Sequence, residues 1–243
     1  MSNRIAVVTG AAGGLGRAFV DRLLADGLTV VGVDIDAAAL LAMAADRAGF
    51  VAEAVELTDS EAVADLFDRL TVRFGGVDAL VNNAGTCFMS DFPDIPAHEL
   101  DRQMAINFSS CFHCCQGAVK AMAGRPGVRK IVNISSNGAY NFDVFDPPHY
   151  RASKAAMDTL TKDLARRYAK EKIAVNSIAP AMTETPLFNV LTEEVLARAI
   201  SAMPHGRAMQ PEEIAKWVGF LISPAGDVSS GNVIILNQGR DVR

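Results

Sequence analysis

The chain lacks several features that mark whole classes of protein. Only 21% of its residues are charged, the net charge is −5, and the 23 basic residues form no cluster, so we expect no nucleic-acid partner. No apolar run reaches the roughly 18 residues of a membrane-spanning helix, so we expect no membrane partner either. The apolar start, MSNRIAVVTGAAGG, is broken by Thr9 and by glycines, and it predicts a first strand rather than a secretion signal.

Cysteine is also scarce, with four residues in 243. Three of them, Cys111, Cys114 and Cys115, fall within CFHCC, which suits no disulfide framework and favours a reduced, cytoplasmic setting. His113 lies among them, but the spacing matches no common zinc pattern and the stretch is apolar and helix-like. We therefore expect no metal site and interpret these cysteines as small buried side chains.

What is present is a regular alternation of two segment types, in a chain that is 50% hydrophobic. Short apolar, β-branched runs predict strands, and longer runs with apolar residues at helical spacing predict helices. Strands that are apolar throughout are buried on both faces, as in a parallel sheet. The alternation predicts one α/β domain over residues 1–243, a Rossmann-like, doubly wound, mostly parallel seven-stranded sheet with helices on both faces. The predicted strands are 4–10, 28–36, 50–57, 77–85, 128–136, 172–180 and 231–239, and the predicted helices are 14–27, 37–49, 59–75, 97–122, 150–171 and 211–223.

Two irregular segments, 137–149 and 181–206, come directly after strands of this sheet. Ligands of open α/β sheets bind beyond the carboxyl ends of the strands, so both segments are candidate substrate loops.

The first strand-to-helix turn, VVTGAAGGLGRAF, holds Gly10, Gly13, Gly14 and Gly16. Glycines let the backbone approach a pyrophosphate, and the helix start offers free N–H groups to it. Asp34 ends the second strand, 18 residues after Gly16, which is close to the distance of an acid that binds the adenosine ribose. It could instead cap the next helix. The ribose role predicts NAD rather than NADP, because the carboxylate would repel a 2′-phosphate.

Six motifs in order make the pattern more specific. They are TGAAGGLG at 9–16, NNAG at 82–85, INF around Asn107, IVNISS ending at Ser136, YRASK at 150–154 and NSIAP at 176–180. Together they resemble the short-chain dehydrogenase/reductase family, in its single-domain branch, along essentially the whole chain. The resemblance implies a catalytic set of Asn107, Ser136, Tyr150 and Lys154. It implies cofactor contacts from Gly10, Gly14, Leu15, Gly16, Asp34, Glu56, Leu57, Asn83, Ala84, Gly85, Tyr150, Lys154, Pro180, Thr183 and Thr185.

The chemistry of these groups agrees with the resemblance. Oxidation of an alcohol by hydride loss also removes the hydroxyl proton, so a base is needed. A free tyrosine has a pKa near 10, and we expect the Lys154 ammonium and the positive nicotinamide to lower that of Tyr150. Ser136 would hold the substrate oxygen, with Ser135 as its competitor. Asn107 would, by resemblance, hold a water that links Lys154 to solvent.

The interval from Ser136 to Tyr150 is one residue longer than is usual in the family, and the insertion falls in a segment rich in aromatic and acidic residues. Asp143, Asp146 and His149 there would suit a polyol or sugar, or would belong to a solvated loop. Apolar side chains from three segments predict a pocket for a medium-sized apolar or cyclic alcohol. The substrate contacts that we expect are Cys87, Tyr140, Phe142, Phe145, Met182 and Phe188.

The sequence therefore predicts an NAD-dependent oxidoreductase acting on a secondary alcohol or its ketone. The alternatives are a 3-oxoacyl thioester reductase, a polyol or sugar dehydrogenase and, more remotely, a dinucleotide-sensing protein without turnover. The helices that carry Asn107 and Tyr150 have apolar residues on more than one face, and the resemblance implies a homo-oligomer, with a tetramer favoured over a dimer.

Overall fold

A seven-stranded parallel sheet forms the centre of the computed structural model, which describes residues 4–142, 146–186, 188 and 191–241. The strand order is β3-β2-β1-β4-β5-β6-β7. The predicted doubly wound α/β fold is confirmed. The strands are β1 (Ile5–Thr9), β2 (Thr29–Asp34), β3 (Phe50–Ala54), β4 (Ala79–Asn82), β5 (Arg129–Ile134), β6 (Ile173–Pro180) and β7 (Val233–Leu236).

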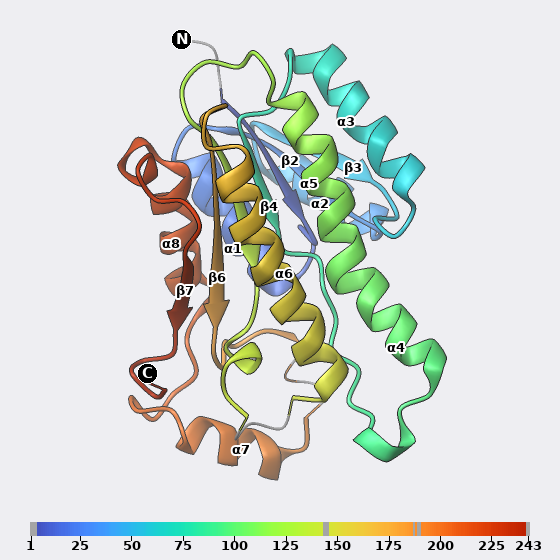
Figure 1. Ribbon diagram of the computed structural model, residues 1–243, viewed down its shortest axis with the longest axis vertical. Helices are drawn as coiled ribbons and strands as arrows, with labels where there is room; N and C mark the ends of the chain where they lie inside the picture. Colours follow the sequence, from blue (N-terminus) through green and yellow to red (C-terminus); the bar gives the residue numbers. More distant parts are fainter. Residues whose placement is uncertain (1–3, 143–145, 187, 189–190, 242–243) are drawn as a thin grey trace.

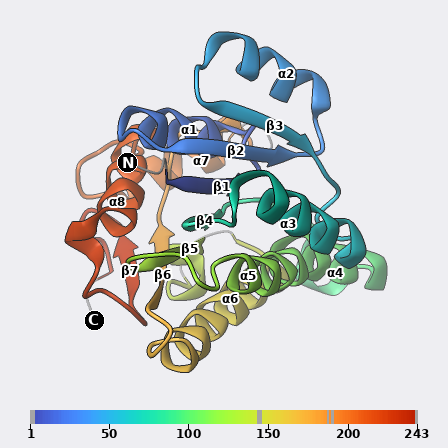
Figure 2. The same cartoon turned by 90° about the horizontal axis from the view of Figure 1, so that it is seen from above.

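Helices cover both faces of the sheet, which is why the central strands are buried throughout (Figure 2). On one face lie α1 (Gly14–Ala25), α2 (Ala37–Asp46) and α8 (Pro211–Ile222), packed in a core around Phe19 and Leu23. On the other face lie α3 (Ser60–Phe74), α5 (Ser110–Ala121) and α6 (Pro148–Arg167), packed around Phe67 and Met157. Each helix thus buries an apolar stripe against the sheet.

The carboxyl ends of the strands meet at one edge of the sheet. β1 lies between β2 and β4, so the chain winds outward from this point in both directions and leaves a crevice there. Thr9, Asp34, Asn82 and Ile134 end their strands at this edge. Figure 1 shows α7 (Glu193–Ser201) beyond the arrowheads of β6 and β7, at the same edge.

Three elements differ from the prediction. The predicted helix 97–122 is α4 (Ala97–Met104) and α5 joined by a π-helical turn, Ala105–Ser109. The segment 181–206 contains α7, which Thr192 caps by accepting a hydrogen bond from the Val195 amide. Helix α6 begins two residues before Tyr150, because a proline at its start fits the first turn of a helix.

All four cysteines are buried and form no disulfide, as the sequence predicted for those in CFHCC. Within the described ranges, no three His, Cys, Asp or Glu side chains gather as metal ligands. None of the helices described there combines the length and apolar character required to cross a bilayer.

Candidate active site

Two adjoining cavities open at the carboxyl edge of the sheet. The larger, of about 780 Å³, is lined by the glycine turn after β1, by the ends of β2 and β4 and by α6. The smaller, of about 150 Å³, is lined by segments after β4, β5 and β6. Tyr150 lines both cavities, and so do Leu15, Ile134, Ser135 and Thr185. Tyr150 therefore stands where contents of the two cavities would meet.

The glycine turn forms an anion cradle. Gly10 has a φ of +61°, and a Cβ there would lie 2.9 Å from the Ala84 Cα, so only glycine fits. Gly13 is the N-cap of α1, and no side chain caps this helix, so its first N–H groups stay available to an anion. Gly16, which we expected to contact the cofactor, lines neither cavity; it lets α1 pack on the turn, because a Cβ there would lie 2.0 Å from the Gly10 oxygen.

Asp34 is fixed in the wall of the larger cavity. One carboxylate oxygen accepts a hydrogen bond from the Ala12 amide (3.0 Å) and the other from the Asp36 amide (3.1 Å). Asp36, not Asp34, caps α2, through the Ala39 amide. The alternative role of Asp34 as a helix cap therefore belongs to its neighbour. Glu56 and Leu57 line the same cavity.

The NNAG turn is tied to the glycine turn. The Asn83 side-chain amide donates to the carbonyls of Thr9 and Gly10, both at 3.1 Å. In return, the Thr9 hydroxyl accepts from the amides of Asn83 and Ala84. Asn83, Ala84 and Gly85 thereby form a second wall of the larger cavity.

Tyr150 is a half-buried phenol beside Ser136. Burial is the largest influence and raises the pKa of Tyr150 above its usual range, the nearby Asp146 charge raises it further, and a hydrogen bond with Ser136 acts in the opposite sense. We expected Lys154 to lower this pKa. In the protein without a nicotinamide, burial outweighs any such effect, although the Lys154 ammonium lies 5.9 Å from the Tyr150 ring centre.

Lys154 lies one helical turn after Tyr150, with 5% of its surface exposed. Its ammonium donates a hydrogen bond to the Ile134 carbonyl at 2.9 Å. Burial lowers the pKa of Lys154 to about 8, against smaller opposite effects of Cys111, Asp158 and Cys87. The Lys154 ammonium therefore loses its proton at a lower pH than a free lysine does.

Asn107 sits in the middle of the π-helical turn and is fully buried. Its amide oxygen accepts from the Thr86 amide (2.8 Å), and its nitrogen donates to the Thr86 carbonyl (2.9 Å) and to the Ser153 hydroxyl (3.0 Å). Gly85 separates it from Lys154: a Cβ on Gly85 would lie 3.3 Å from the Asn107 oxygen and 3.4 Å from the Lys154 nitrogen. Lys154 and Asn107 thus face each other across a gap that a side chain would fill.

A buried acid, Asp158, lies one turn beyond Lys154 and was not expected from the sequence. Three hydroxyls donate to its carboxylate, from Ser135 (2.8 Å), Tyr140 (2.8 Å) and Ser177 (2.5 Å). Burial raises the pKa of Asp158, and these hydrogen bonds oppose the rise. Because the Ser135 hydroxyl already donates to Asp158, the structure favours Ser136 over Ser135 as the candidate serine for contact with substrate.

The smaller cavity contains three of the expected substrate contacts, Cys87, Met182 and Phe188. Burial raises the pKa of the Cys87 thiol to about 12, which suits a wall residue rather than a nucleophile. Pro180 and Thr183, expected at the cofactor, line this cavity, while Thr185 lines both.

Other expected substrate contacts lie elsewhere. Tyr140 turns its hydroxyl to Asp158, and Phe142 is 72% exposed beneath the Arg151 guanidinium; neither lines either of these two cavities. His149 is buried against Glu99, at 3.2 Å. Phe145 and Asp143 lie outside the described residues.

Asp146 and Arg240 do line the smaller cavity, and Arg240 was missed because it lies near the end of the chain.

Comparison with known proteins agrees with this geometry. A family model described as enoyl-(acyl carrier protein) reductase matches residues 10–241. The chain is 36% identical to cis-4-hydroxycyclohexanecarboxylate dehydrogenase of Sinomonas cyclohexanicum, over 98% of this chain and 96% of that protein. It is 30% identical to a 3-oxoacyl-[acyl-carrier-protein] reductase of Thermotoga maritima, over 98% of both chains.

A solved structure is similar throughout. It is 3-ketoacyl-(acyl-carrier-protein) reductase of Brucella melitensis complexed with NADH, which has a TM-score of 0.91, 25% identity and coverage of 98% of both chains.

Proposed function

The chain belongs to the short-chain dehydrogenase/reductase family and is an oxidoreductase acting on CH–OH groups; from this we propose that it interconverts a secondary alcohol and its ketone with NAD. The observation that carries the proposal is the position of Tyr150. It hydrogen-bonds Ser136, lies one turn from Lys154 and lines both the larger and the smaller cavity.

The residues fit a dinucleotide. The cavity of about 780 Å³ combines an uncapped helix start, glycines that admit no side chain and a fixed carboxylate at Asp34. The uncapped N–H groups of α1 would hold the pyrophosphate, and Asp34 would accept hydrogen bonds from the ribose hydroxyls. When bound, the nicotinamide accepts or supplies the hydride.

Tyr150 and Ser136 handle the proton. In alcohol oxidation, Ser136 holds the substrate hydroxyl and the Tyr150 phenolate takes its proton as the hydride leaves carbon. In ketone reduction, protonated Tyr150 donates a proton to the developing alkoxide. Because burial raises the pKa of Tyr150, the free protein favours the protonated form, and oxidation requires added positive charge nearby.

Lys154 would pass the proton onward. Its lowered pKa, about 8, suits a group that exchanges protons near neutrality. A water between Lys154 and Asn107, beside Gly85, would complete a relay to solvent.

Asp34 supports NAD over NADP. The two basic residues in the described wall of the larger cavity are Arg102 and Lys154, and neither pairs with Asp34, so nothing there compensates a 2′-phosphate beside the carboxylate. The similar structure from Brucella melitensis was solved with NADH.

A medium-sized cyclic or apolar alcohol fits the smaller cavity best. Cys87, Met182, Phe188 and Leu191 give it an apolar wall, and one relative acts on a hydroxylated cyclohexane ring. A 3-oxoacyl thioester reductase is the second candidate, supported by the relative from Thermotoga maritima. Activity on acetoacetyl thioesters with NADPH that exceeds all activity with NAD would favour it.

We also propose a cytoplasmic homo-oligomer, with a tetramer favoured over a dimer. Four free cysteines agree with a reducing compartment. Trp217 and Phe220 on α8 are 42% and 46% exposed, which gives the chain an apolar surface that a second copy would cover.

The test of the reaction is Tyr150→Phe. The purified enzyme is given NAD and a panel of cyclic and linear secondary alcohols, and NADH formation is followed by absorbance. We expect kcat to fall about 10²–10⁴-fold, since general acid–base catalysis is lost, while NAD still binds. A variant that retains most of the wild-type kcat would contradict the mechanism, and a wild type inactive on the whole panel with either cofactor would contradict the function.

The test of the cofactor is Asp34→Ala. We expect the ratio of kcat/KM for NAD over NADP to fall by about tenfold or more, because a like-charge repulsion is removed. Asp36→Ala, which removes a neighbouring carboxylate that caps α2, is the matched control and should leave the ratio unchanged. A wild type that already prefers NADPH would show the ribose assignment to be wrong.

A further inference from the structure

Asp146 is a carboxylate in the smaller, otherwise mostly apolar cavity. The backbone of this residue is held, because the Arg151 guanidinium donates to its carbonyl at 2.7 Å. The side chain is different: no hydrogen bond or ion pair joins either carboxylate oxygen to another residue of the described chain. The donors for this half-buried carboxylate must therefore come from the cavity, from water or from a ligand that replaces it.

The carboxylate lies against the reacting side of the cavity. A Cβ built on Gly138 would lie 2.0 Å from an Asp146 carboxylate oxygen and 3.2 Å from the Ser136 hydroxyl, so the two oxygens are near neighbours. The absence of a side chain at Gly138 is what admits the carboxylate. Its charge also acts on both Tyr150 and Cys87 across the cavity.

An ionised carboxylate only accepts hydrogen bonds, so its complement on a substrate is a hydroxyl or an ammonium. Arg151 and Arg240 lie near enough to oppose the Asp146 charge, and Arg240 lines the same cavity. Because the local charge is already offset, a neutral hydroxyl fits better than a cation. Ser136 and Tyr150 take the reacting oxygen, and Asp146 adjoins Ser136, so this hydroxyl belongs on the carbon next to the reacting one.

We propose that Asp146 selects substrates with a second hydroxyl beside the reacting carbon, so that the enzyme prefers vicinal diols, and α-hydroxy ketones in reverse, over simple alcohols and ketones. The proposal rests on the dehydrogenase function above and names its substrate class. Asp146 is a specificity-determining residue, and the proton transfer itself remains with Tyr150.

The test compares cis- and trans-cyclohexane-1,2-diol with cyclohexanol, using NAD and the full-length enzyme. We expect wild-type kcat/KM for the better diol to exceed that for cyclohexanol, and Asp146→Ala to lower this ratio about 10–100-fold, the effect of losing a hydrogen bond to a charged group. Asp146→Asn keeps one acceptor oxygen and the side-chain shape and should lower the ratio less. Asp163→Asn, an exposed change on α6, is the control and should leave the ratio unchanged.

The outcomes separate the two proposals. An unchanged ratio in a folded Asp146→Ala that binds NAD, or a wild type that prefers cyclohexanol, overturns this inference alone. If Asp146→Ala does not fold, an unchanged ratio in Asp146→Asn and Asp146→Ser together overturns it. Turnover of none of these compounds, or of any other secondary alcohol or ketone, overturns the dehydrogenase function and this inference with it.

Discussion

Lys154 is a buried cation at the proposed active site. Its ammonium donates a hydrogen bond to the Ile134 carbonyl at 2.9 Å, and its side chain is almost wholly removed from water. Burial therefore lowers its pKa from 10.5 to about 8. A group whose charged form is disfavoured in the folded state weakens that state wherever it is charged, so under the proposed mechanism this residue trades stability for activity.

Replacement of this lysine by methionine should abolish turnover and stabilise the protein. At pH 7 we expect a gain on the order of 1 kcal/mol in the free energy of unfolding, because desolvation of the ammonium is relieved while its hydrogen bond is lost. The folded wild type loses its buried charge above about pH 8, whereas the unfolded chain keeps this charge up to about pH 10.5. Wild-type stability therefore rises over that window, and the difference in unfolding free energy between the variant and the wild type becomes smaller.

Urea unfolding of wild type and Lys154→Met at pH 7 and pH 10 measures this difference in unfolding free energy. Lys162→Met, an exposed change on the same helix, is the control and should show little effect at either pH. A Lys154→Met variant that is less stable than wild type at pH 7, or a stability difference that does not depend on pH, would show that burial of the Lys154 ammonium does not destabilise the fold.

For single residues, the direction in which a side chain points is the property that the sequence predicts least well. The motifs brought Tyr150, Lys154, Ser136 and Asn107 to the same region, because their spacing reflects a shared fold. Tyr140 was expected at substrate from its aromatic character alone, yet its hydroxyl donates to Asp158, whose need for donors arises only when β5, β6 and α6 pack together.

At the scale of elements, the π-helical turn Ala105–Ser109 decides where Asn107 points. A π turn adds a residue to one helical turn and so rotates the next part of the helix, and such turns occur often at functional sites. The sequence predicted one continuous helix here, because no composition pattern marks a π turn. Helix α7 is different: Thr192 and the acidic residues after it are a recognisable helix start, although the segment around them is irregular.

Substitution of Gly85 tests whether catalysis requires the space between Asn107 and Lys154. In Gly85→Ala the new methyl would lie 3.3 Å from the Asn107 oxygen and 3.4 Å from the Lys154 nitrogen, close enough to displace both slightly. We expect kcat at saturating NAD and substrate to fall about tenfold or more through loss of the relay, with a stability change of at most about 1–3 kcal/mol, typical of overpacking. Thermal unfolding and NAD titration separate this effect from misfolding or lost cofactor; an unchanged kcat would argue against a relay at this place.

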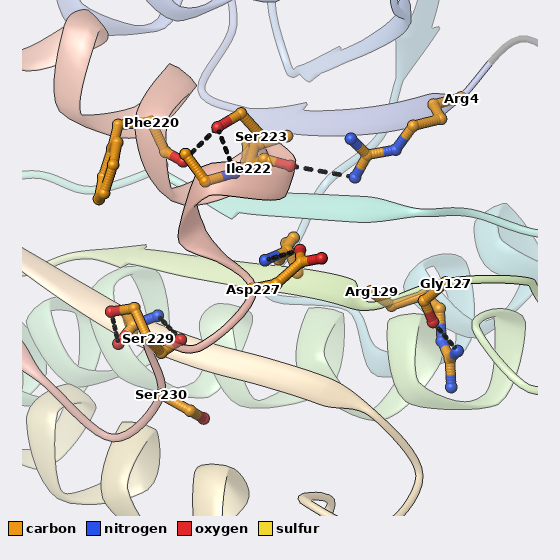
Figure 3. A network of polar contacts seen from close by, with 12 residues as sticks. Arg4, Gly127, Arg129, Phe220, Ile222, Ser223, Asp227, Ser229 and Ser230 are labelled. Carbon is orange, nitrogen blue, oxygen red and sulfur yellow. Dashed lines mark hydrogen bonds and ion pairs between the residues drawn. The ribbon is translucent and has the colours of Figure 1, made fainter.

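At the scale of the whole molecule, the edge of the sheet at the carboxyl ends of the strands differs from the edge at their amino ends, the amino edge. The carboxyl edge holds the cavities, and the opposite edge holds polar contacts that join distant parts of the chain. Figure 3 shows Arg4, which donates to the Ile222 carbonyl at 3.1 Å, and Asp227, which pairs with Lys130 at 2.7 Å. The alternation of strands and helices predicted the sheet, but not these pairs, because their partners lie far apart in the sequence and carry no motif.

The Lys130–Asp227 pair should support stability without touching catalysis. The Lys130 side chain is 2% exposed and that of Asp227 is 42% exposed; burial lowers the pKa of Lys130, and Asp227 opposes this. Asp227→Ala leaves a buried ammonium unpaired, and we expect a loss of about 1–3 kcal/mol at pH 7, reduced from that of a fully buried pair because water screens Asp227. The loss should shrink at alkaline pH, as Lys130 gives up its proton in the folded state and the pair disappears from both proteins.

Urea unfolding at pH 7 and pH 10, with kcat/KM measured alongside, tests this division between the two edges. Asp163→Ala removes the exposed pair with Arg167 and is the matched control, for which we expect a loss below about 0.5 kcal/mol. We expect Asp227→Ala to lose stability while its kcat/KM stays at the wild-type value, because Lys130 lies at the start of β5 and the residues proposed to meet substrate come after its end. A lowered kcat/KM with unchanged stability would mean instead that the amino edge is coupled to the active site through β5.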